Sequence, residues 1–310
     1  MRGIYFDGEK AIYREDLPKP VPTKTQSLIK IMSAGICSTD KEILRGYRPN
    51  FRGVMGHEFT GIVEASDDPF WIGRRVVGEL NAGCGHCVYC RTGREKHCLE
   101  RKVIGMEGKD GCFGEYMTLE THLLHEVPES LPLEKALLTE PLAAAYEIPQ
   151  QVHLAPDQNV AVIGDGRLAY LIAGVLSLSG VDLTVIGKHP EKLKRFQPFG
   201  RVTLEPADTY EIVVEATGSP SGLELASRIV RHQGTIVLKS TYAGTTQVDM
   251  SYFVVNEITI TGSRCGPFAP ALRALEKGLI KLPPVEFYDL KDYEAAFQSR
   301  AFKAGFLIGK

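Results

Sequence analysis

The sequence predicts two domains: a mainly β, partly open barrel and a doubly wound parallel α/β sheet. Residues 1–140 consist of short strand-like segments separated by Gly and Pro, with few long helical patterns. Such spacing is typical of a barrel of short strands. After about Pro141, continuous apolar runs alternate with helical segments. That alternation is typical of a parallel sheet that is covered by helices on both faces.

Each domain is expected to contain the following elements. In the first domain, strands are predicted at residues 28–31, 61–65 and 74–78. In the second, buried strands are predicted at residues 159–163, 183–186, 212–214, 235–238 and 258–261, with a helix at 167–179 after the first of them. The remaining segment is expected to form helices at 271–278 and 293–300 and a strand at 306–308.

The composition excludes several classes of protein. The chain has 310 residues, of which 44% are hydrophobic and 24% charged, and its formal net charge is −2. This balance gives no indication of a nucleic-acid partner or of an acidic membrane surface. No apolar run is long enough for a signal peptide or a membrane span. We therefore expect a cytoplasmic protein with reduced thiols.

Four cysteines form the strongest local motif. Cys84, Cys87, Cys90 and Cys98 account for four of the seven cysteines and lie within fifteen residues of one another. One chain segment with this spacing can place four thiolates around a tetrahedral zinc ion. A disulfide framework is the main alternative, but the rest of the chain does not resemble a small secreted scaffold. The motif predicts a structural zinc site.

A glycine-rich turn follows the first strand of the second domain. Gly164 allows a tight turn, Gly166 lets the backbone approach a pyrophosphate, and Ala169 lets the helix pack on the strand. The position of the turn, between a buried strand and a helix N-terminus, is the context in which this motif binds dinucleotides. Asp165, an acid inside the turn, is expected to point away from the phosphates.

The end of the next strand predicts which coenzyme binds. Sites for NAD(H) usually place an Asp or Glu there, where it binds the ribose 2′-hydroxyl. This chain has Gly187, followed by Lys188 and His189. Glycine leaves room for a 2′-phosphate and lysine supplies positive charge, so NADP(H) is expected in preference to NAD(H). The alternative is that Lys188 and His189 belong to an ordinary solvated loop.

Taken together, the motifs resemble those of one known family. In chain order they are Gly35-Ile36-Cys37-Ser38-Thr39-Asp40, Gly56-His57-Glu58, the four-cysteine loop, Glu140-Pro141-Leu142 and the glycine-rich turn. In this order they resemble the zinc-dependent medium-chain dehydrogenases, the superfamily of alcohol, polyol and threonine dehydrogenases, over nearly the whole chain. The resemblance implies a Rossmann coenzyme domain over residues 142–263. It also implies a discontinuous, GroES-like catalytic domain over residues 1–141 and 264–310.

The resemblance also implies a catalytic zinc, and hence two zinc ions per chain. Cys37 and His57 match the first two ligands of the family. Glu140, in its Glu-Pro-Leu context, matches the third ligand of the polyol-type branch. Glu58 is expected to bind the metal directly or to alternate with water. Three protein ligands and one open position are what a catalytic zinc requires.

Further roles follow from the same resemblance. Thr39 matches the hydroxyl that relays the proton from the substrate alcohol, although a simple turn threonine is the alternative reading. Lys41 and Glu42 lie where several relatives have a histidine that continues the relay. Arg264 is a candidate coenzyme contact. Family members are commonly homodimers or homotetramers, and strand 258–261 is a plausible edge for pairing between subunits.

The sequence thus predicts an oxidoreductase that transfers hydride between NADP(H) and a zinc-bound alcohol or carbonyl. The substrate would be a secondary alcohol, a polyol, an aldehyde or a ketone. Two alternatives remain open. One is a zinc-free reductase of quinones or activated alkenes, and the other is a non-catalytic NADPH-binding sensor on the same fold.

Overall fold

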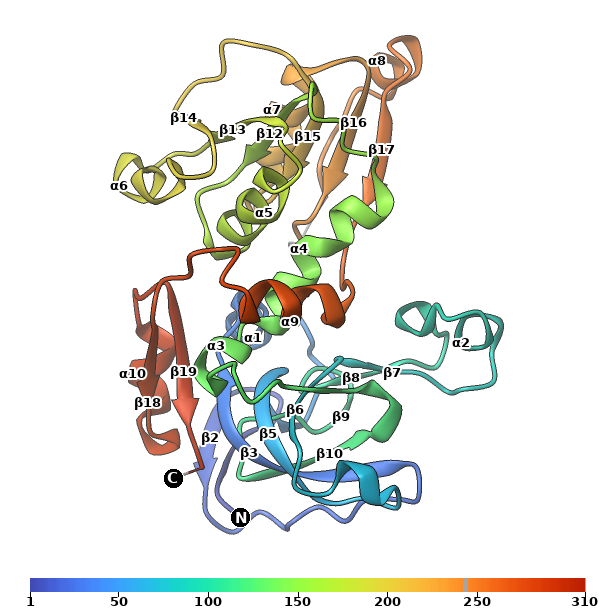
Figure 1. The fold of residues 1–310 in the computed structure, drawn as a ribbon, viewed down its shortest axis with the longest axis vertical. Coiled ribbons are helices and arrows are strands. Elements are labelled where there is room, and N and C mark those ends of the chain that lie inside the picture. Colours follow the sequence, from blue (N-terminus) through green and yellow to red (C-terminus); the bar gives the residue numbers. More distant parts are fainter. Residues whose placement is uncertain (242–244, 310) are drawn as a thin grey trace. The chain divides into compact units, whose positions relative to one another are not determined.

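The chain folds into two compact units. The computed structural model describes residues 1–241 and 245–309. Unit 1 comprises Met1–Glu140 together with Phe268–Lys310, and unit 2 comprises Pro141–Pro267 (Figure 1). Unit 1 is therefore discontinuous in sequence, because its last strands come from the C-terminal segment.

Unit 1 is built mainly from β-strands. Its largest sheet has the order β11-β6-β5-β3-β19-β18, and β10 also pairs with β3. The strands of this sheet are β3 (Gln26–Gly35), β5 (Glu58–Ala65), β6 (Arg75–Gly78), β10 (Tyr116–Glu120), β11 (Leu124–Glu126), β18 (Val285–Tyr288) and β19 (Lys303–Leu307). Two three-stranded sheets accompany it, formed by β1 (Gly3–Phe6), β2 (Ala11–Arg14) and β4 (Gly53–Val54), and by β7 (Asn81–Ala82), β8 (Lys102–Ile104) and β9 (Gly108–Lys109).

The helices of unit 1 are short. They are α1 (Ser38–Ile43), α2 (Val88–Arg91), α3 (Leu133–Ala136), α9 (Phe268–Glu276) and α10 (Tyr293–Gln298), with 3-10 turns η1 (Pro69–Trp71), η2 (Glu95–His97), η3 (Thr121–Leu123) and η5 (Leu290–Asp292). In the large sheet, β10 alternates buried and half-buried side chains: its Met117 and Leu119 are buried and their neighbours are half-buried. This period of two is that of a strand with one face on a core.

β3 is the strand that brings distant parts of unit 1 together. It pairs antiparallel with β5 on one side and with β19 on the other. In these registers Gly35 lies opposite both Glu58 and Gly305. The start of β5 and the C-terminal strand therefore meet at the end of β3, where the chain turns into α1.

Unit 2 is a six-stranded parallel sheet with the order β14-β13-β12-β15-β16-β17. Its strands are β12 (Asn159–Ile163), β13 (Asp182–Ile186), β14 (Arg201–Thr203), β15 (Tyr210–Glu215), β16 (Val230–Leu238) and β17 (Thr259–Gly262). The strand order reverses between β12 and β15. In doubly wound sheets, ligands bind at the carboxyl ends of the strands at this point of reversal.

The helices that accompany this sheet in sequence are α4 (Thr139–Gln151), which begins in the last residues of unit 1, α5 (Arg167–Ser177), α6 (Pro190–Leu193), α7 (Pro220–Ile229) and α8 (Met250–Val255), with the 3-10 turn η4 (Lys194–Phe196). α5 packs against β12 and β13, and α7 packs against β15 and β16. In the described part of the chain, no helix has both the length and the apolar character needed to cross a bilayer.

The predicted fold class is confirmed, whereas some elements were missed. The predicted strands of unit 2 match β12, β13, β15, β16 and β17 to within a few residues. β14 and β18 were not predicted. Both are short and partly exposed, so neither produces the apolar run by which a buried strand is recognised. The predicted helix at 167–179 ends at Ser177.

Candidate active site and metal sites

Three potential metal ligands meet at the end of β3. The donor atoms of Cys37, His57 and Glu58 all lie within 4.8 Å of one another. Cys37 precedes α1, and Glu58 begins β5 directly after His57. The side chains of His57 and Glu58 are buried. The β3–β5 register therefore assembles a thiol, an imidazole and a carboxylate in one place from two separate stretches of sequence.

Asp40 supports two of these groups from α1. Its Oδ2 accepts a hydrogen bond of 2.7 Å from the Cys37 N–H, which fixes the turn that carries the thiol. Its Oδ1 lies 3.3 Å from His57 Nδ1, although the two atoms are too poorly aligned for a hydrogen bond. Burial alone would lower the pKa of His57, but the Asp40 carboxylate and the Cys37 thiol together outweigh it and raise that pKa well above its ordinary value. The surroundings of the imidazole thus favour positive charge.

Lys303 supports the third group from the C-terminal strand. Its Nζ forms an ion pair with Glu58 Oε2, and both side chains are buried. The pair lies directly over Gly35: a Cβ on this residue would lie 2.6 Å from Glu58 Oε2 and 2.8 Å from Lys303 Cε. Glycine at position 35 therefore provides the space that the pair occupies. Cys112 lies beside it, and its buried Sγ donates to the Glu58 carbonyl at 3.3 Å.

Neither Asp40 nor Lys303 was expected from the sequence to support these ligands. A usable signal existed for Lys303, which is the one charged residue in the strand Lys303–Leu307. A buried lysine in a strand requires an acidic or polar partner. Its partner is far away in sequence, however, and only the β3–β5 and β3–β19 registers identify it.

Two further predicted residues lie in unit 1. Thr39 Oγ1 is 3.7 Å from Cys37 Sγ, so its hydroxyl lies beside the candidate ligand group. Glu140 is the half-buried second residue of α4. Among the residues that the structure describes, it does not join the group whose donor atoms lie within 4.8 Å. Its role as third zinc ligand therefore stays a prediction.

The four cysteines of the second motif also converge. Their Sγ atoms all lie within 4.8 Å of one another, and those of Cys87 and Cys90 are 3.6 Å apart. Four thiolates around zinc at about 2.3 Å would be about 3.8 Å apart. The N–H groups of Cys84 and Glu100 donate to Cys98 Sγ at 3.2 and 3.3 Å. None of the seven cysteines forms a disulfide, which the alternative to a zinc site would require.

The ionisation of these thiols also favours a cation. Backbone N–H groups, that of Cys90 first, lower the pKa of Cys87 to about 6. Desolvation, together with the neighbouring sulfurs, raises the pKa of Cys90 to about 12. One thiolate therefore forms readily while its neighbour resists, because desolvation disfavours the charged form of Cys90 and the nearby sulfurs add to that effect. A zinc ion removes that conflict, and the four sulfurs fit it.

The glycine-rich turn of unit 2 has the shape that a dinucleotide needs. Gly164 has a φ of 135°, and a Cβ on it would lie 2.6 Å from the Ala216 carbonyl oxygen. A Cβ on Gly166, the residue preceding α5, would meet nothing within 4 Å. Ala169 is buried on the inner face of the helix. The turn is therefore tight at its first glycine and open at its second, where a phosphate would approach the helix N-terminus.

The end of β13 holds an unexpected carboxylate. Gly187, Lys188 and His189 follow this strand as predicted, and Gly187 is buried. The side chain of Asp165 turns toward them from the glycine-rich turn, and its Oδ2 accepts from the N–H groups of Lys188 and His189, each at 2.9 Å. Arg264 follows β17 and is exposed, and its carbonyl accepts a bond of 2.8 Å from Lys239 Nζ.

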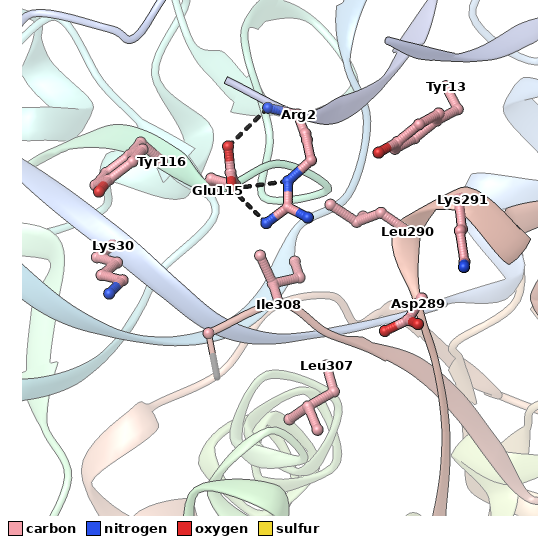
Figure 2. A pocket seen from close by; sticks show the side chains of 11 residues that line it. Arg2, Tyr13, Lys30, Glu115, Tyr116, Asp289, Leu290, Lys291, Leu307 and Ile308 are labelled. Atoms are coloured by element: carbon pink, nitrogen blue, oxygen red, sulfur yellow. Dashed lines mark hydrogen bonds and ion pairs between the residues drawn. The ribbon is translucent and has the colours of Figure 1, made fainter. Parts of the chain in front are cut away.

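A separate cavity of about 400 Å³ lies in unit 1. Figure 2 shows Arg2, Tyr13, Glu115 and Lys291 among the side chains that line it. The Arg2 guanidinium is already engaged, since its Nε donates to Glu115 Oε1 at 2.9 Å. None of the predicted site residues lines this cavity. Its size therefore does not mark it as the reaction site.

Comparison with known proteins supports one family. The alcohol dehydrogenase GroES-like domain matches residues 23–129. A sorbitol dehydrogenase of Halalkalibacterium halodurans is 27% identical over 94% of this chain and 92% of its own length. The crystal structure of an alcohol dehydrogenase (rspB) from Escherichia coli CFT073 in complex with NADH has a TM-score of 0.89, with 25% identity and 99% of both chains covered.

These matches support placing the chain in the zinc-type medium-chain alcohol dehydrogenase superfamily. The relatives named above are dehydrogenases of a polyol and of an alcohol. A zinc-binding dehydrogenase from Sinorhizobium meliloti bound to NADP shares the fold, with a TM-score of 0.89 at 22% identity over 99% of this chain and 98% of its own. The relatives thus include one solved with NADH and one solved with NADP.

Proposed function

We propose that this protein is a zinc-dependent dehydrogenase of secondary alcohols or polyols, or the corresponding carbonyl reductase, that prefers NADP(H). The observation that carries the proposal is the group of Cys37, His57 and Glu58, whose donor atoms lie within 4.8 Å of one another beside a threonine hydroxyl. A thiol, an imidazole and a carboxylate form a ligand set that suits zinc. A zinc-free reductase would have no use for it.

Two sites would hold metal. Cys37 and His57 would bind the catalytic zinc, with Glu140 or Glu58 as the third ligand, and the four clustered cysteines would bind the structural zinc. A bound catalytic zinc supplies Lewis acidity, which polarises the oxygen of an alcohol or a carbonyl. Glu58 is shared between this role and Lys303, whose ammonium holds its Oε2. We therefore favour Glu140 as the permanent third ligand.

The remaining residues of the site position groups and move the proton. Asp40 fixes the Cys37 turn through its bond to the N–H group, and its other carboxylate oxygen places negative charge 3.3 Å from His57 Nδ1. A carboxylate close to a ligating histidine raises the basicity of the ring. Thr39 lies next to the thiol and would relay the substrate hydroxyl proton, accepting it at Oγ1 while its own hydroxyl proton passes on to solvent, as hydride is transferred to the nicotinamide.

The coenzyme would bind along the carboxyl end of the sheet in unit 2. Gly164 and Gly166 would admit the pyrophosphate at the start of α5, and Arg264 would contact the coenzyme from the segment after β17. The preference for NADP(H) rests on Gly187, where no acidic side chain arises from the strand end, and on the positive charge of Lys188. The two relatives solved with different coenzymes leave this choice to the residues of this chain.

We expect the protein to be a cytoplasmic homodimer or homotetramer. Supporting this, β17 is the edge strand of the unit 2 sheet, and its residues are largely exposed. Val254 and Val255 of the preceding helix α8 are 73% and 79% exposed. An unpaired edge flanked by exposed apolar side chains favours pairing with a second copy of the chain.

The test is an initial-rate survey with both coenzymes over secondary alcohols, polyols, aldehydes and ketones, combined with a zinc count by mass spectrometry. The expected result is two zinc ions per chain and an NADPH-linked rate that a chelator abolishes. A rate that survives complete loss of zinc would support the zinc-free reductase instead. One zinc per chain, coenzyme binding and no turnover with any substrate would support the non-catalytic sensor.

A further inference from the structure

The carboxylate of Asp165, in the glycine-rich turn, lies where an acidic side chain at the end of β13 would otherwise lie. Sites for NAD(H) usually have an acid at the end of the second strand, and this chain has Gly187 there. A Cβ built on Gly187 would lie 2.8 Å from Asp165 Cβ and 3.0 Å from Asp165 Oδ2. The Asp165 side chain therefore fills the space into which an acid at position 187 would extend.

The contacts of Asp165 hold it in this place. Its Oδ2 accepts three hydrogen bonds, from the N–H groups of Lys188 and His189 at 2.9 Å each and from His189 Nδ1 at 2.8 Å. Its Oδ1 lies 3.7 Å from Lys192 Nζ, and the side chain is 11% exposed. Although burial opposes it, bonding to His189 and to the backbone lowers the pKa of Asp165, so the group is charged at neutral pH.

The surroundings of Asp165 are positively charged. Lys188, His189 and Lys192 are all exposed, and Lys188 Nζ extends to Ser221 Oγ at 3.3 Å. These groups would attract a 2′-phosphate, whereas Asp165 would repel it. Asp165 also occupies the N–H groups of Lys188 and His189, which are donors that an anion at this strand end would otherwise use.

We propose that Asp165 is a coenzyme-selecting residue of this chain. It supplies from the glycine-rich turn the negative charge that the end of β13 lacks. In doing so it favours the ribose 2′-hydroxyl of NAD(H) and limits the preference for NADP(H) that Lys188 and Lys192 create. The inference rests on the proposed function in one respect, namely that unit 2 binds a nicotinamide dinucleotide.

The test measures binding of two coenzyme fragments to the full-length protein by titration calorimetry. Adenosine 2′,5′-bisphosphate carries the 2′-phosphate of NADP, and 5′-AMP carries the free 2′-hydroxyl. Asp165→Asn removes the charge but keeps an oxygen that accepts from the same N–H groups. Near a doubly charged phosphate in a solvent-like dielectric, loss of one charge should raise the binding ratio of the bisphosphate to 5′-AMP about tenfold. The shift should shrink at high salt.

Asp182→Asn is the matched control. Asp182 begins β13, at the end of that strand opposite to Gly187. Its carboxylate pairs with Arg201 at 3.0 Å, and both side chains are exposed. Its loss should leave the ratio unchanged. Should Asp165→Asn fold poorly by circular dichroism, Asp165→Ser removes the same charge with a smaller acceptor. The same shift in ratio is expected of it.

The outcomes separate two questions. An unchanged ratio in the Asp165 variants would overturn the selecting role, and so would an equal loss of both ligands, which would make Asp165 only a support for the loop. Failure of the unmutated protein to bind either fragment would instead contradict the proposed coenzyme site. Gly187→Asp is a poorer test, because its Cβ would also lie 2.9 Å from Leu193 Cδ2 and would displace Asp165.

Discussion

The two sulfur-containing groups of unit 1 are built in different ways. The four-cysteine group comes from one loop of fifteen residues, and backbone N–H groups of the same loop, such as that of Cys84, donate to its sulfurs. The group of Cys37, His57 and Glu58 comes from two stretches of sequence that the β3–β5 register brings together. Its supporting side chains, Asp40 and Lys303, are themselves buried and charged.

The difference indicates how each group responds to change. The loop supplies its own ligands and its own hydrogen bonds, so a defect there should remain local. The group of Cys37, His57 and Glu58 depends on buried charged side chains that neutralise one another. Removing one of these charges leaves its partner buried and unpaired. The group of Cys37, His57 and Glu58 should therefore govern turnover and the stability of unit 1. The four-cysteine group should govern only its own loop.

The largest expected effect comes from removing a ligand from the group of Cys37, His57 and Glu58. His57→Ala should lower turnover about a thousandfold or more, because polarisation by a metal contributes several kcal/mol to the barrier. The variant should retain one of two zinc ions, that of the four-cysteine loop. Rates with saturating coenzyme and a zinc count by mass spectrometry check both expectations.

Cys265→Ser is the control for that experiment, since this thiol belongs to neither metal-ligand group among the described residues. It should keep both zinc ions and the unmutated rate. Retention of both zinc ions by His57→Ala would contradict the assignment of His57 as a ligand.

The next effect concerns the buried ion pair. Lys303→Met should destabilise the protein by about 3 kcal/mol, because it leaves the Glu58 carboxylate buried without its partner. Lys303→Met combined with Glu58→Gln should recover part of this loss, because the second change removes the unpaired charge. Urea unfolding monitored by circular dichroism measures both.

Lys109→Met is the matched control for the ion pair. Lys109 pairs with Glu120 at 3.1 Å, but the two side chains are 9% and 18% exposed. Its loss should cost less, because water can reach the carboxylate that remains. An equal loss of unfolding free energy in the two variants would show that burial of the Glu58–Lys303 pair does not increase its contribution to stability.

The same contrast explains what could be predicted from the sequence. The four-cysteine loop was identified from spacing alone because all of its ligands are local. The glycine-rich turn was identified from its glycine spacing between a buried strand and a helix, and Cys37 and His57 were recognised through the family whose motifs they match. Asp40 and Lys303 were not, because their partners are set by strand registers. β3 joins residue 305 to residue 58 across almost the whole chain.

Asp165 illustrates a further limit. The sequence shows an acid in the glycine-rich turn and no acid at Gly187, and these two facts were read separately. The carboxylate was expected to point away from the phosphates. The structure shows it bonded to the N–H groups of Lys188 and His189, so the missing charge of one segment is supplied by another. Side-chain direction of this kind depends on the tertiary fold and not on local pattern.

A smaller effect is expected from the four-cysteine loop. Cys87→Ser removes one of four thiolates and should release the second zinc. We expect the melting temperature to fall by about 5 °C, or roughly 2 kcal/mol, because the loss of the metal loosens a local segment while the rest of unit 1 stays folded. Limited proteolysis should cut within the loop. Turnover per mole of remaining zinc should stay close to that of the unmutated protein, and its collapse would contradict the separation of the two groups.

The smallest effect is expected from Thr39, which lies beside the group of Cys37, His57 and Glu58 but is not one of its proposed metal ligands. Thr39→Ala should lower turnover about tenfold or more, because proton transfer from the substrate hydroxyl loses its nearest acceptor. Zinc content and melting temperature should stay unchanged, since Thr39 is only half-buried. Thr39→Ser keeps the hydroxyl and should restore most of the rate, with the solvent isotope effect of the unmutated enzyme. An unmutated rate in the alanine variant would reduce Thr39 to a turn residue, and an equal loss in the serine variant would assign its role to the methyl group.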